Sequence, residues 1–248
     1  MRLSLIEITD ALTATMVPVP ADSCDVCPIC RSWRAEGEHL CNNCQQATEE
    51  LAAPCRRVIP ICLYSKPSDM RDRLKFYKDG DEAQRARYAP EIAAILDRFF
   101  LEYGGQLAAV TGGWDVACVV PSESRRPPHP LEVALAELPT KHVPHRERLL
   151  ERNPGEPVGH RTVNDLAFRP LTDVAGRQVL VLDDVYTTGA RAQSAASALS
   201  RAGATVAAIV VVARRVNPDY KPGVQAMWNR QAPIPFSFKA APWWAGRD

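Results

Sequence analysis

Two adjacent carboxylates, two threonines and a glycine stand together in the stretch VLVLDDVYTTGA, residues 179–190. The apolar residues before Asp183 predict a buried strand, and the residues from Ala190 onward predict a helix. Asp183 and Asp184 therefore fall at the carboxyl end of a strand, which is where open α/β sheets bind their ligands.

The turn between this strand and helix has the composition of an anion site. The first amides of a helix have no intrahelical acceptors, and the helix dipole adds partial positive charge at the same place. Glycine in the turn would let the backbone approach a phosphate closely. The expected phosphate contacts are the backbone and hydroxyl groups of Thr187, Thr188, Gly189 and Ala190. We expect Tyr186 only to shape this turn.

The neighbouring acids narrow the choice of ligand. Carboxylates repel phosphate, but they are strong acceptors for hydroxyl groups. A phosphorylated ribose satisfies both requirements, with its 5′-phosphate in the turn and its hydroxyls on Asp183 and Asp184. A plain strand–turn–helix join with an aspartate cap accounts for only one of the two acids. A Walker-type phosphate loop is excluded, because the stretch lacks Gly-Lys-Thr.

The spacing of the cysteines near the N-terminus indicates a metal-binding site. The chain has 8 cysteines, and two CxxC pairs enclose ten residues, a spacing that suits tetrahedral zinc bound by Cys27, Cys30, Cys41 and Cys44. Cys24 offers an alternative first pair with Cys27, and His39 an alternative ligand. Buried free thiols are the other interpretation. Four sulfur ligands would make the zinc structural. The remaining cysteines, Cys55, Cys62 and Cys118, are expected in the core.

The elements that position these residues alternate between strand and helix. Apolar runs predict strands at 58–64, 115–120 and 205–213 in addition to the one before Asp183. Helical periodicity predicts helices at 68–79, at 89–103 (ending at Gly104-Gly105) and at 129–138. This order predicts a doubly wound, mostly parallel α/β sheet. The expected divisions are an amphipathic helix (1–21), a zinc module (22–48), the α/β domain (55–215) and an irregular proline- and tryptophan-containing tail (216–248).

Composition sets broad limits on function. The chain has 248 residues and a formal net charge of +1, which argues against wholesale coating of nucleic acid. Glu7 and Asp10 interrupt the first segment, where a signal peptide or membrane helix needs apolar residues. No other stretch is long and apolar enough to span a bilayer, so we expect a cytoplasmic protein.

The stretch 179–190 resembles the binding motif of type I phosphoribosyltransferases. Together with the paired cysteines, it makes the chain similar to the ComF family (competence protein, amidophosphoribosyltransferase-like). The segments LKFYKDGD, DVACVVP and GATVAAIVVVARR also match that family. The resemblance implies a sheet of the type I phosphoribosyltransferase kind, a structural Zn²⁺, and 5-phospho-α-D-ribosyl 1-diphosphate (PRPP) with Mg²⁺ as ligand.

The implied reaction transfers a 5-phosphoribosyl group to a base or amine and releases pyrophosphate. Asp183 and Asp184 would orient the ribose and stabilise its positive charge. Lys75, Arg125 or Arg126 would assist in neutralising the pyrophosphate. Ser122, Ser124, Arg125 and Arg126 could supply donors to it, and a solvated basic loop is the other interpretation of these four residues. The loop PSESRRPPHPLEVAL and the segment 151–168 depart from the family pattern.

An alternative is a non-catalytic PRPP-binding accessory protein of DNA uptake. Seven basic residues occur between 56 and 78 against two acids, and such a segment could contact single-stranded DNA: Arg56, Arg57, Lys66, Arg71, Arg73, Lys75 and Lys78. A solvated helix face is the simpler interpretation of this run. A homodimer is a further expectation.

Overall fold

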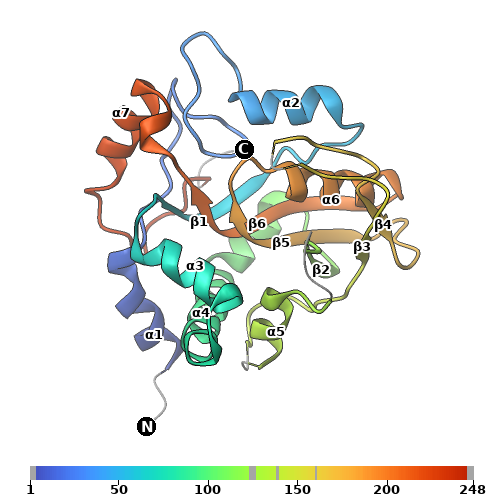
Figure 1. Ribbon diagram of the computed structural model, residues 1–248, viewed down its shortest axis with the longest axis horizontal. Coiled ribbons are helices and arrows are strands. Elements are labelled where there is room, and N and C mark those ends of the chain that lie inside the picture. The colour runs from blue at the N-terminus through green and yellow to red at the C-terminus, as the bar shows by residue number, and fades with distance from the viewer. Residues whose placement is uncertain (1–3, 123–126, 138–139, 160, 245–248) are drawn as a thin grey trace.

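A parallel four-stranded sheet forms the centre of the molecule. The computed structural model describes residues 4–122, 127–137, 140–159 and 161–244. The strands are β1 (Val58–Tyr64), β2 (Val116–Val119), β5 (Gln178–Tyr186) and β6 (Thr205–Arg215), in the order β1-β6-β5-β2 (Figure 1). All three pairings are parallel. The predicted α/β architecture with a parallel sheet is confirmed.

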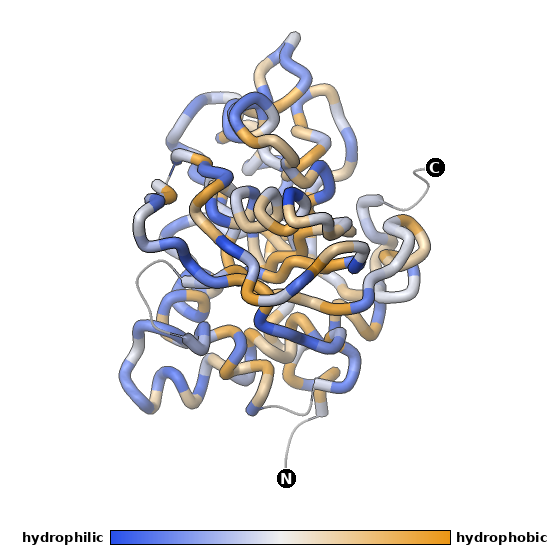
Figure 2. The backbone as a smooth tube through the Cα atoms, turned by 90° about the vertical axis from the view of Figure 1, so that its right-hand side faces the viewer, coloured by the Kyte–Doolittle hydropathy of each residue, from blue (hydrophilic) through white to orange (hydrophobic). Residues whose placement is uncertain are grey.

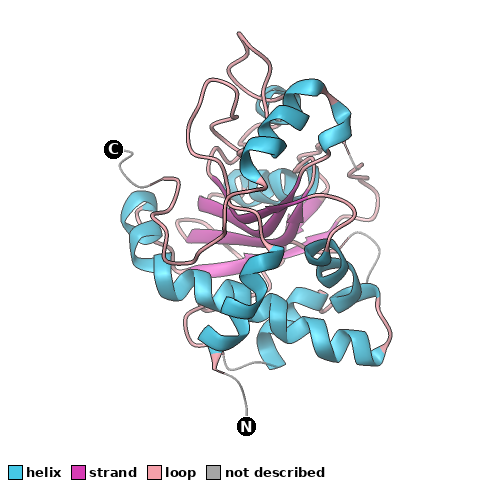
Figure 3. Cartoon of the chain, turned by 90° about the vertical axis from the view of Figure 1, so that its left-hand side faces the viewer, coloured by secondary structure: helices cyan, strands magenta, loops and turns pink. Residues whose placement is uncertain are grey.

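Helices cover both faces of the sheet, as Figures 1 and 3 show. On one face lie α2 (Asn42–Glu50) and α6 (Ala190–Arg201). On the other lie α1 (Leu5–Leu12), α3 (Asp69–Asp79), α4 (Glu82–Thr111) and α5 (Pro130–Glu137). No helix in the described part of the chain is both long enough and apolar enough to cross a bilayer.

Alternation along the central strands creates a separate core on each face. Val179 and Val181 of β5 pack with α6, whereas Leu180 and Leu182 pack with α4. Successive strand residues point to opposite faces, and a strand buried on both is therefore apolar throughout. Figure 2 shows the strands as a hydrophobic centre inside a more polar outer layer. The cysteine cluster belongs to the α6 side.

Helix α4 is much longer than the sequence predicts. The expected end at Gly104-Gly105 is wrong, because the helix continues through both glycines to Thr111. Asp81 begins it with a capping box, and Gly112 ends it with a φ of 79°. Leu107 is fully buried, so apolar packing holds the helix together beyond the glycine pair. The favourable burial outweighs the modest helix cost of two glycines.

The sequence predicts an irregular C-terminal tail, but part of this tail is helical. It contains a helix, α7 (Pro222–Gln231), that begins at a proline. Val224 and Met227 bury one short face against the cysteine module, where Gly223 lies under the Trp33 indole. Farther on, Trp244 packs edge-on against Phe99 and Tyr103 of α4. Two buried positions one helical turn apart are too few to give a recognisable period.

A small antiparallel hairpin lies outside the main sheet. Its strands are β3 (Leu150–Arg152) and β4 (Phe168–Pro170). The sequence does not predict this hairpin, because three-residue strands carry no useful periodicity. The segment between its strands brings Gly159 to the carboxyl edge of the sheet, beside the candidate site.

Candidate functional site

A cavity of about 400 Å³ lies at the carboxyl ends of β1, β5 and β6. It is lined by both acids of the motif, by the whole turn that follows them, and by side chains of α3. The structure therefore brings together the predicted residues Asp183, Asp184, Thr187, Thr188, Gly189, Ala190 and Lys75. Arg125, Arg126 and Ser124 lie outside the described residues, and Ser122 lines a neighbouring cavity with His129.

Gly189 adopts a conformation that other residues rarely reach. Its φ is +87°, and it caps the start of α6. A Cβ atom at this position would lie 2.1 Å from the Cζ and Oη atoms of Tyr186. The sequence predicts that glycine is needed for close approach of a phosphate. The structure gives a different first reason, which is that Tyr186 occupies the space beneath it.

Tyr186 is buried below the turn rather than exposed in the cavity. Its side chain belongs to the α6-side core, and its Oη accepts a hydrogen bond from Gln193 Nε2 at 3.3 Å. The Arg214 guanidinium lies 5.1 Å from the centre of its ring. This arrangement supports the expectation that Tyr186 shapes the turn.

The two acids of the motif have different partners because adjacent strand residues point to opposite faces. Asp184 Oδ2 accepts hydrogen bonds from Tyr77 Oη and, at 2.6 Å, from Lys78 Nζ of α3. Asp183 Oδ2 lies 3.7 Å from Arg191 Nη2 of α6. Asp183 Oδ1 accepts from the Asp184 backbone amide at 2.9 Å. Asp184 Oδ1 is buried without a hydrogen-bond partner among the described residues.

These surroundings drive the two carboxyl pKa values apart. Both side chains are almost fully buried, at 2% exposure for Asp183 and 0% for Asp184. Burial raises the pKa of Asp183 to about 7, despite the opposing effect of Arg191. Burial alone would raise the pKa of Asp184 too, but Lys78 and His129 reverse this and hold it below its usual range. Asp184 is therefore the firmly ionised member of the pair.

Cations surround the acids and the turn. The cavity-lining set is Lys66, Arg71, Lys75, Lys78, Arg191 and Arg215. Of these, the resemblance implies a ligand role only for Lys75. Arg71 and Lys78 come from α3, and the others come from the ends of β1 and β6 and from the first turn of α6. These elements become neighbours only when the sheet forms. The local signals for this set are the basic run at 56–78 and the pair Arg214-Arg215 at the end of an apolar run.

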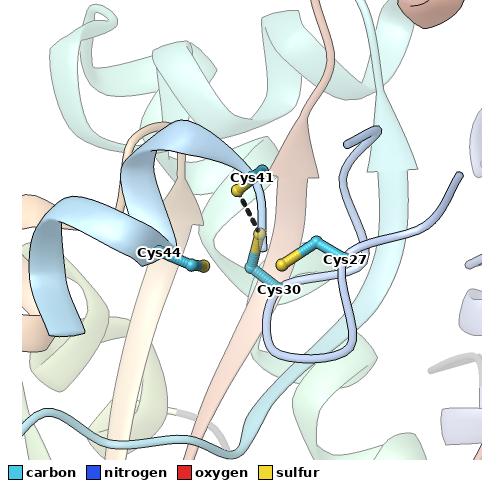
Figure 4. A group of neighbouring side chains, drawn as sticks. All are labelled: Cys27, Cys30, Cys41 and Cys44. Atoms are coloured by element: carbon cyan, nitrogen blue, oxygen red, sulfur yellow. Dashed lines mark hydrogen bonds between the residues drawn. The ribbon is translucent and has the colours of Figure 1, made fainter. Parts of the chain in front are cut away.

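The second candidate site is the cysteine cluster. Cys27 and Cys30 come from a loop, and Cys41 and Cys44 from the start of α2, with all four side chains converging (Figure 4). All four sulfurs are buried and lie within 4.8 Å of one another, with Cys30 and Cys41 only 3.5 Å apart. Cys24 and His39 are exposed and outside the cluster, while Cys55, Cys62 and Cys118 are buried elsewhere.

This donor set fits a structural zinc ion. Zinc–sulfur bonds of about 2.3 Å place tetrahedral sulfurs about 3.8 Å apart, which is close to the spacing of the cluster. Four thiolates around a dication carry net negative charge, and two buried guanidiniums lie beside them. The Arg31 and Arg214 side chains are 0% and 2% exposed, respectively. Their positions suit a buried anionic centre better than four neutral thiols.

Comparisons with known proteins concern the backbone arrangement. No protein-family model and no curated protein matches the sequence. Among solved structures, the chain is similar to a phosphoribosyltransferase from Corynebacterium diphtheriae, with 19% identity, a TM-score of 0.30, and coverage of 60% of this chain and 94% of that one. It is also similar to the allosteric regulatory enzyme of purine biosynthesis, with 21% identity and a TM-score of 0.28, covering 48% of this chain and 26% of that one. The chain thus spans about a quarter of the second protein's length.

Proposed function

We propose that the chain binds PRPP and transfers its 5-phosphoribosyl group to a base or amine. The observation that carries this proposal is the pair of buried carboxylates beside the first turn of α6, in a cavity that six cationic side chains and Asp79 also line. A simple anion site has no use for two acids. A ribose phosphate uses both kinds of group, because its hydroxyls donate to carboxylates and its phosphate accepts from amides.

Each part of the ligand has a complementary part of the cavity. The 5′-phosphate would bind the turn 187–190, and the ribose hydroxyls would donate to Asp183 and to the unpartnered Oδ1 of Asp184. Lys75 and the neighbouring cations would hold the pyrophosphate, with Arg125 and Arg126 as proposed contributors. Mg²⁺ arriving with the pyrophosphate would neutralise part of its charge.

The same groups would serve the transfer step. The C1′–oxygen bond breaks with its electron pair leaving on pyrophosphate, and the acceptor nitrogen forms the new bond to C1′ and gives up a proton. The ionised Asp184 would stabilise positive charge that grows on the ribose ring. Anchoring of the remote phosphate would hold C1′ in position for attack.

A charge-neutral variant of both acids tests this assignment. Asp183→Asn with Asp184→Asn keeps the side-chain size but removes the acceptor charge. We expect PRPP binding, measured by calorimetry with Mg²⁺, to weaken roughly tenfold or more for each lost charge-assisted hydrogen bond, or about 1.5–3 kcal/mol. Inorganic phosphate should bind equally well or better, because the repelling carboxylates are gone. Unchanged PRPP affinity in this variant would sink the ribose-phosphate assignment.

The zinc proposal has its own test. Freshly purified protein kept under reducing conditions should contain one zinc per chain, because the four clustered thiols fit that ion. Cys41→Ser should release the metal, whereas Cys24→Ser and Cys118→Ser should not, because those side chains lie outside the cluster. Metal analysis of the three variants decides this. Zinc retained in Cys41→Ser, or lost in Cys24→Ser, would show that the ligand set is wrong.

Binding of single-stranded DNA remains a prediction. The structure shows, however, that most of the basic residues behind this prediction line the cavity. Four of the seven basic residues in the segment 56–78 line the cavity rather than a separate surface: Lys66, Arg71, Lys75 and Lys78. Arg57 donates to the Ala207 carbonyl, and Arg73 pairs with Glu91. A steep loss of DNA affinity with added salt would support this alternative. Turnover of PRPP with an acceptor base or amine would support the enzyme. Homodimer formation also stays a prediction.

A further inference from the structure

Two consecutive side chains of α3, Tyr77 and Lys78, donate to the same oxygen atom of Asp184. The Tyr77 hydroxyl and the Lys78 ammonium group both hydrogen-bond to Oδ2, the ammonium group at 2.6 Å. The other oxygen, Oδ1, is buried with no hydrogen-bond partner among the described residues. One side of this carboxylate is therefore held by the protein, while the other side has an unused acceptor.

The Tyr77 ring fixes its hydroxyl in the core. Met70, Leu74 and Tyr77 form the buried face of α3 and belong to the same core as Leu182 of β5. Asp184 lies two residues after Leu182, so its side chain is on the same face of the strand. Tyr77 is only 2% exposed. Its hydroxyl therefore has little freedom to move away from the carboxylate.

Lys78 extends from the next position of α3 to the wall of the cavity. Its side chain is 23% exposed and lines the cavity together with Asp184. A buried carboxylate needs a counter-charge and hydrogen-bond donors, and this ammonium group supplies both. The neighbouring acid is held differently, because Arg191 Nη2 is 3.7 Å from Asp183 Oδ2 and belongs to α6. Of the two acids, it is Asp184 that α3 holds.

We propose that Tyr77 and Lys78 are positioning residues that orient the Asp184 carboxylate toward a hydroxyl of the ribose. This inference rests on the proposed function, because it concerns how the same site would recognise the sugar. Two donors on Oδ2 fix the plane of the carboxylate, so the lone pairs of Oδ1 have a fixed direction. Hydrogen bonds weaken steeply when they are misaligned, and an acceptor that is already oriented loses less freedom on binding. Helix α3 thereby sets the preference for a phosphorylated sugar over phosphate alone.

The preference for ribose 5-phosphate over inorganic phosphate measures this positioning. Both ligands would bind the turn 187–190, but only the sugar has hydroxyls to donate to Asp184. The parent protein should bind ribose 5-phosphate at least about tenfold more tightly, as one charge-assisted hydrogen bond implies. Tyr77→Phe keeps the ring in the core and removes one donor. It should lower the preference about threefold to tenfold and leave the affinity for inorganic phosphate unchanged, as measured by calorimetric titration.

Matched variants separate positioning from packing. Tyr103→Phe also removes a tyrosine hydroxyl, which donates to two backbone carbonyls of the C-terminal tail, so it should leave the preference unchanged. Lys78→Met should weaken both ligands, because the cavity loses a cation, but it should weaken the sugar more. Lys78→Arg should recover part of the preference. In a protein that already carries Asp184→Asn, Tyr77→Phe should change the preference much less, because it acts through that carboxylate.

The possible failures are distinguishable. A parent preference that survives unchanged in Tyr77→Phe would overturn the positioning role and leave the proposed function standing. A parent protein that binds ribose 5-phosphate no better than inorganic phosphate would overturn the ribose assignment. Crystal structures of the ligand-free parent and Tyr77→Phe would then test the positioning by themselves. The Asp184 carboxylate should turn, or occupy two orientations, in the variant, and an unchanged single orientation would overturn the proposal. If Lys78→Met does not fold, Tyr77→Phe decides.

Discussion

Gly189→Ala is expected to weaken binding of ribose 5-phosphate and PRPP by at least about 100-fold, equivalent to about 2.7 kcal/mol. The added methyl group would lie 2.1 Å from atoms of the Tyr186 ring, so either the ring or the turn has to move. The φ of +87° adds a cost of about 1–2 kcal/mol for a residue with a Cβ. The steric clash and the backbone strain both distort the turn that would hold the phosphate. Calorimetric titration of the two ligands measures the loss.

Gly112→Ala is the matched control. Gly112 also has a strongly positive φ, +79°, but a Cβ there would meet nothing within 4 Å. It ends α4, outside the cavity, so this variant should lose about 1–2 kcal/mol of stability without losing ligand affinity. Adding Tyr186→Ala to Gly189→Ala should recover part of the binding by making space for the methyl group. Equal ligand affinity in the parent and Gly189→Ala would contradict the proposed geometry of the turn.

The strand, turn and helix that form the candidate site could be predicted because their signal is local. A strand, two acids, Thr-Thr-Gly and the first residue of a helix follow one another within the stretch 179–190. The cysteine cluster was predictable for a similar reason, since each pair occupies one short turn. Exclusion of Cys24 is also consistent with the unambiguous second pair and with Pro28 in the first knuckle.

The rest of the cavity could not be predicted, because it depends on which strands become neighbours. Lys66 follows β1 and Arg215 ends β6, and they are far apart in the sequence. The pairing of Tyr64 with Arg215 brings these strand ends together. No local spacing encodes that pairing.

Elements were mispredicted where burial opposes local preference. The glycine pair at 104–105 is typical of a helix end, but the apolar contacts of Leu107 continue α4 beyond it. In the tail, α7 depends on packing against Trp33 of the cysteine module, so its own sequence shows little periodicity. In both cases, the deciding interaction is tertiary, and a single-segment pattern does not contain it.

Asp183→Asn is expected to stabilise the ligand-free protein much more at pH 8 than at pH 5. The carboxyl group of Asp183 has a pKa of about 7 in the folded chain, raised from 3.8 by burial. Between these values, the unfolded chain releases the proton while the folded chain keeps it, so rising pH favours unfolding. At 1.36 kcal/mol per pKa unit, the penalty at pH 8 is at most about 4 kcal/mol. Asparagine removes it because it does not ionise.

Asp184 does not obscure this effect, because its pKa shift has the opposite sign. Its pKa is lowered, so its favourable contribution is complete above the unfolded value and is lost only in more acidic solution. Over pH 5–8 the slope from this pair therefore comes from Asp183. Urea unfolding at pH 5, 6.5 and 8, without Mg²⁺ or ligand, measures it. Asp219→Asn, at an exposed position, is the control and should follow the parent protein.

The same variant should bind PRPP more weakly, so stability and binding would change in opposite directions. Such opposite changes are expected of a carboxylate whose burial destabilises the folded protein but whose charge strengthens ligand binding. In the parent protein, PRPP with Mg²⁺ should restore stability most at pH 8, where the carboxylate is ionised and has a hydroxyl to accept from. If the parent and Asp183→Asn have the same stability at all three pH values, then burial imposes no penalty on this carboxylate. Asp183 would in that case be an ordinary structural acid rather than one kept for a ribose.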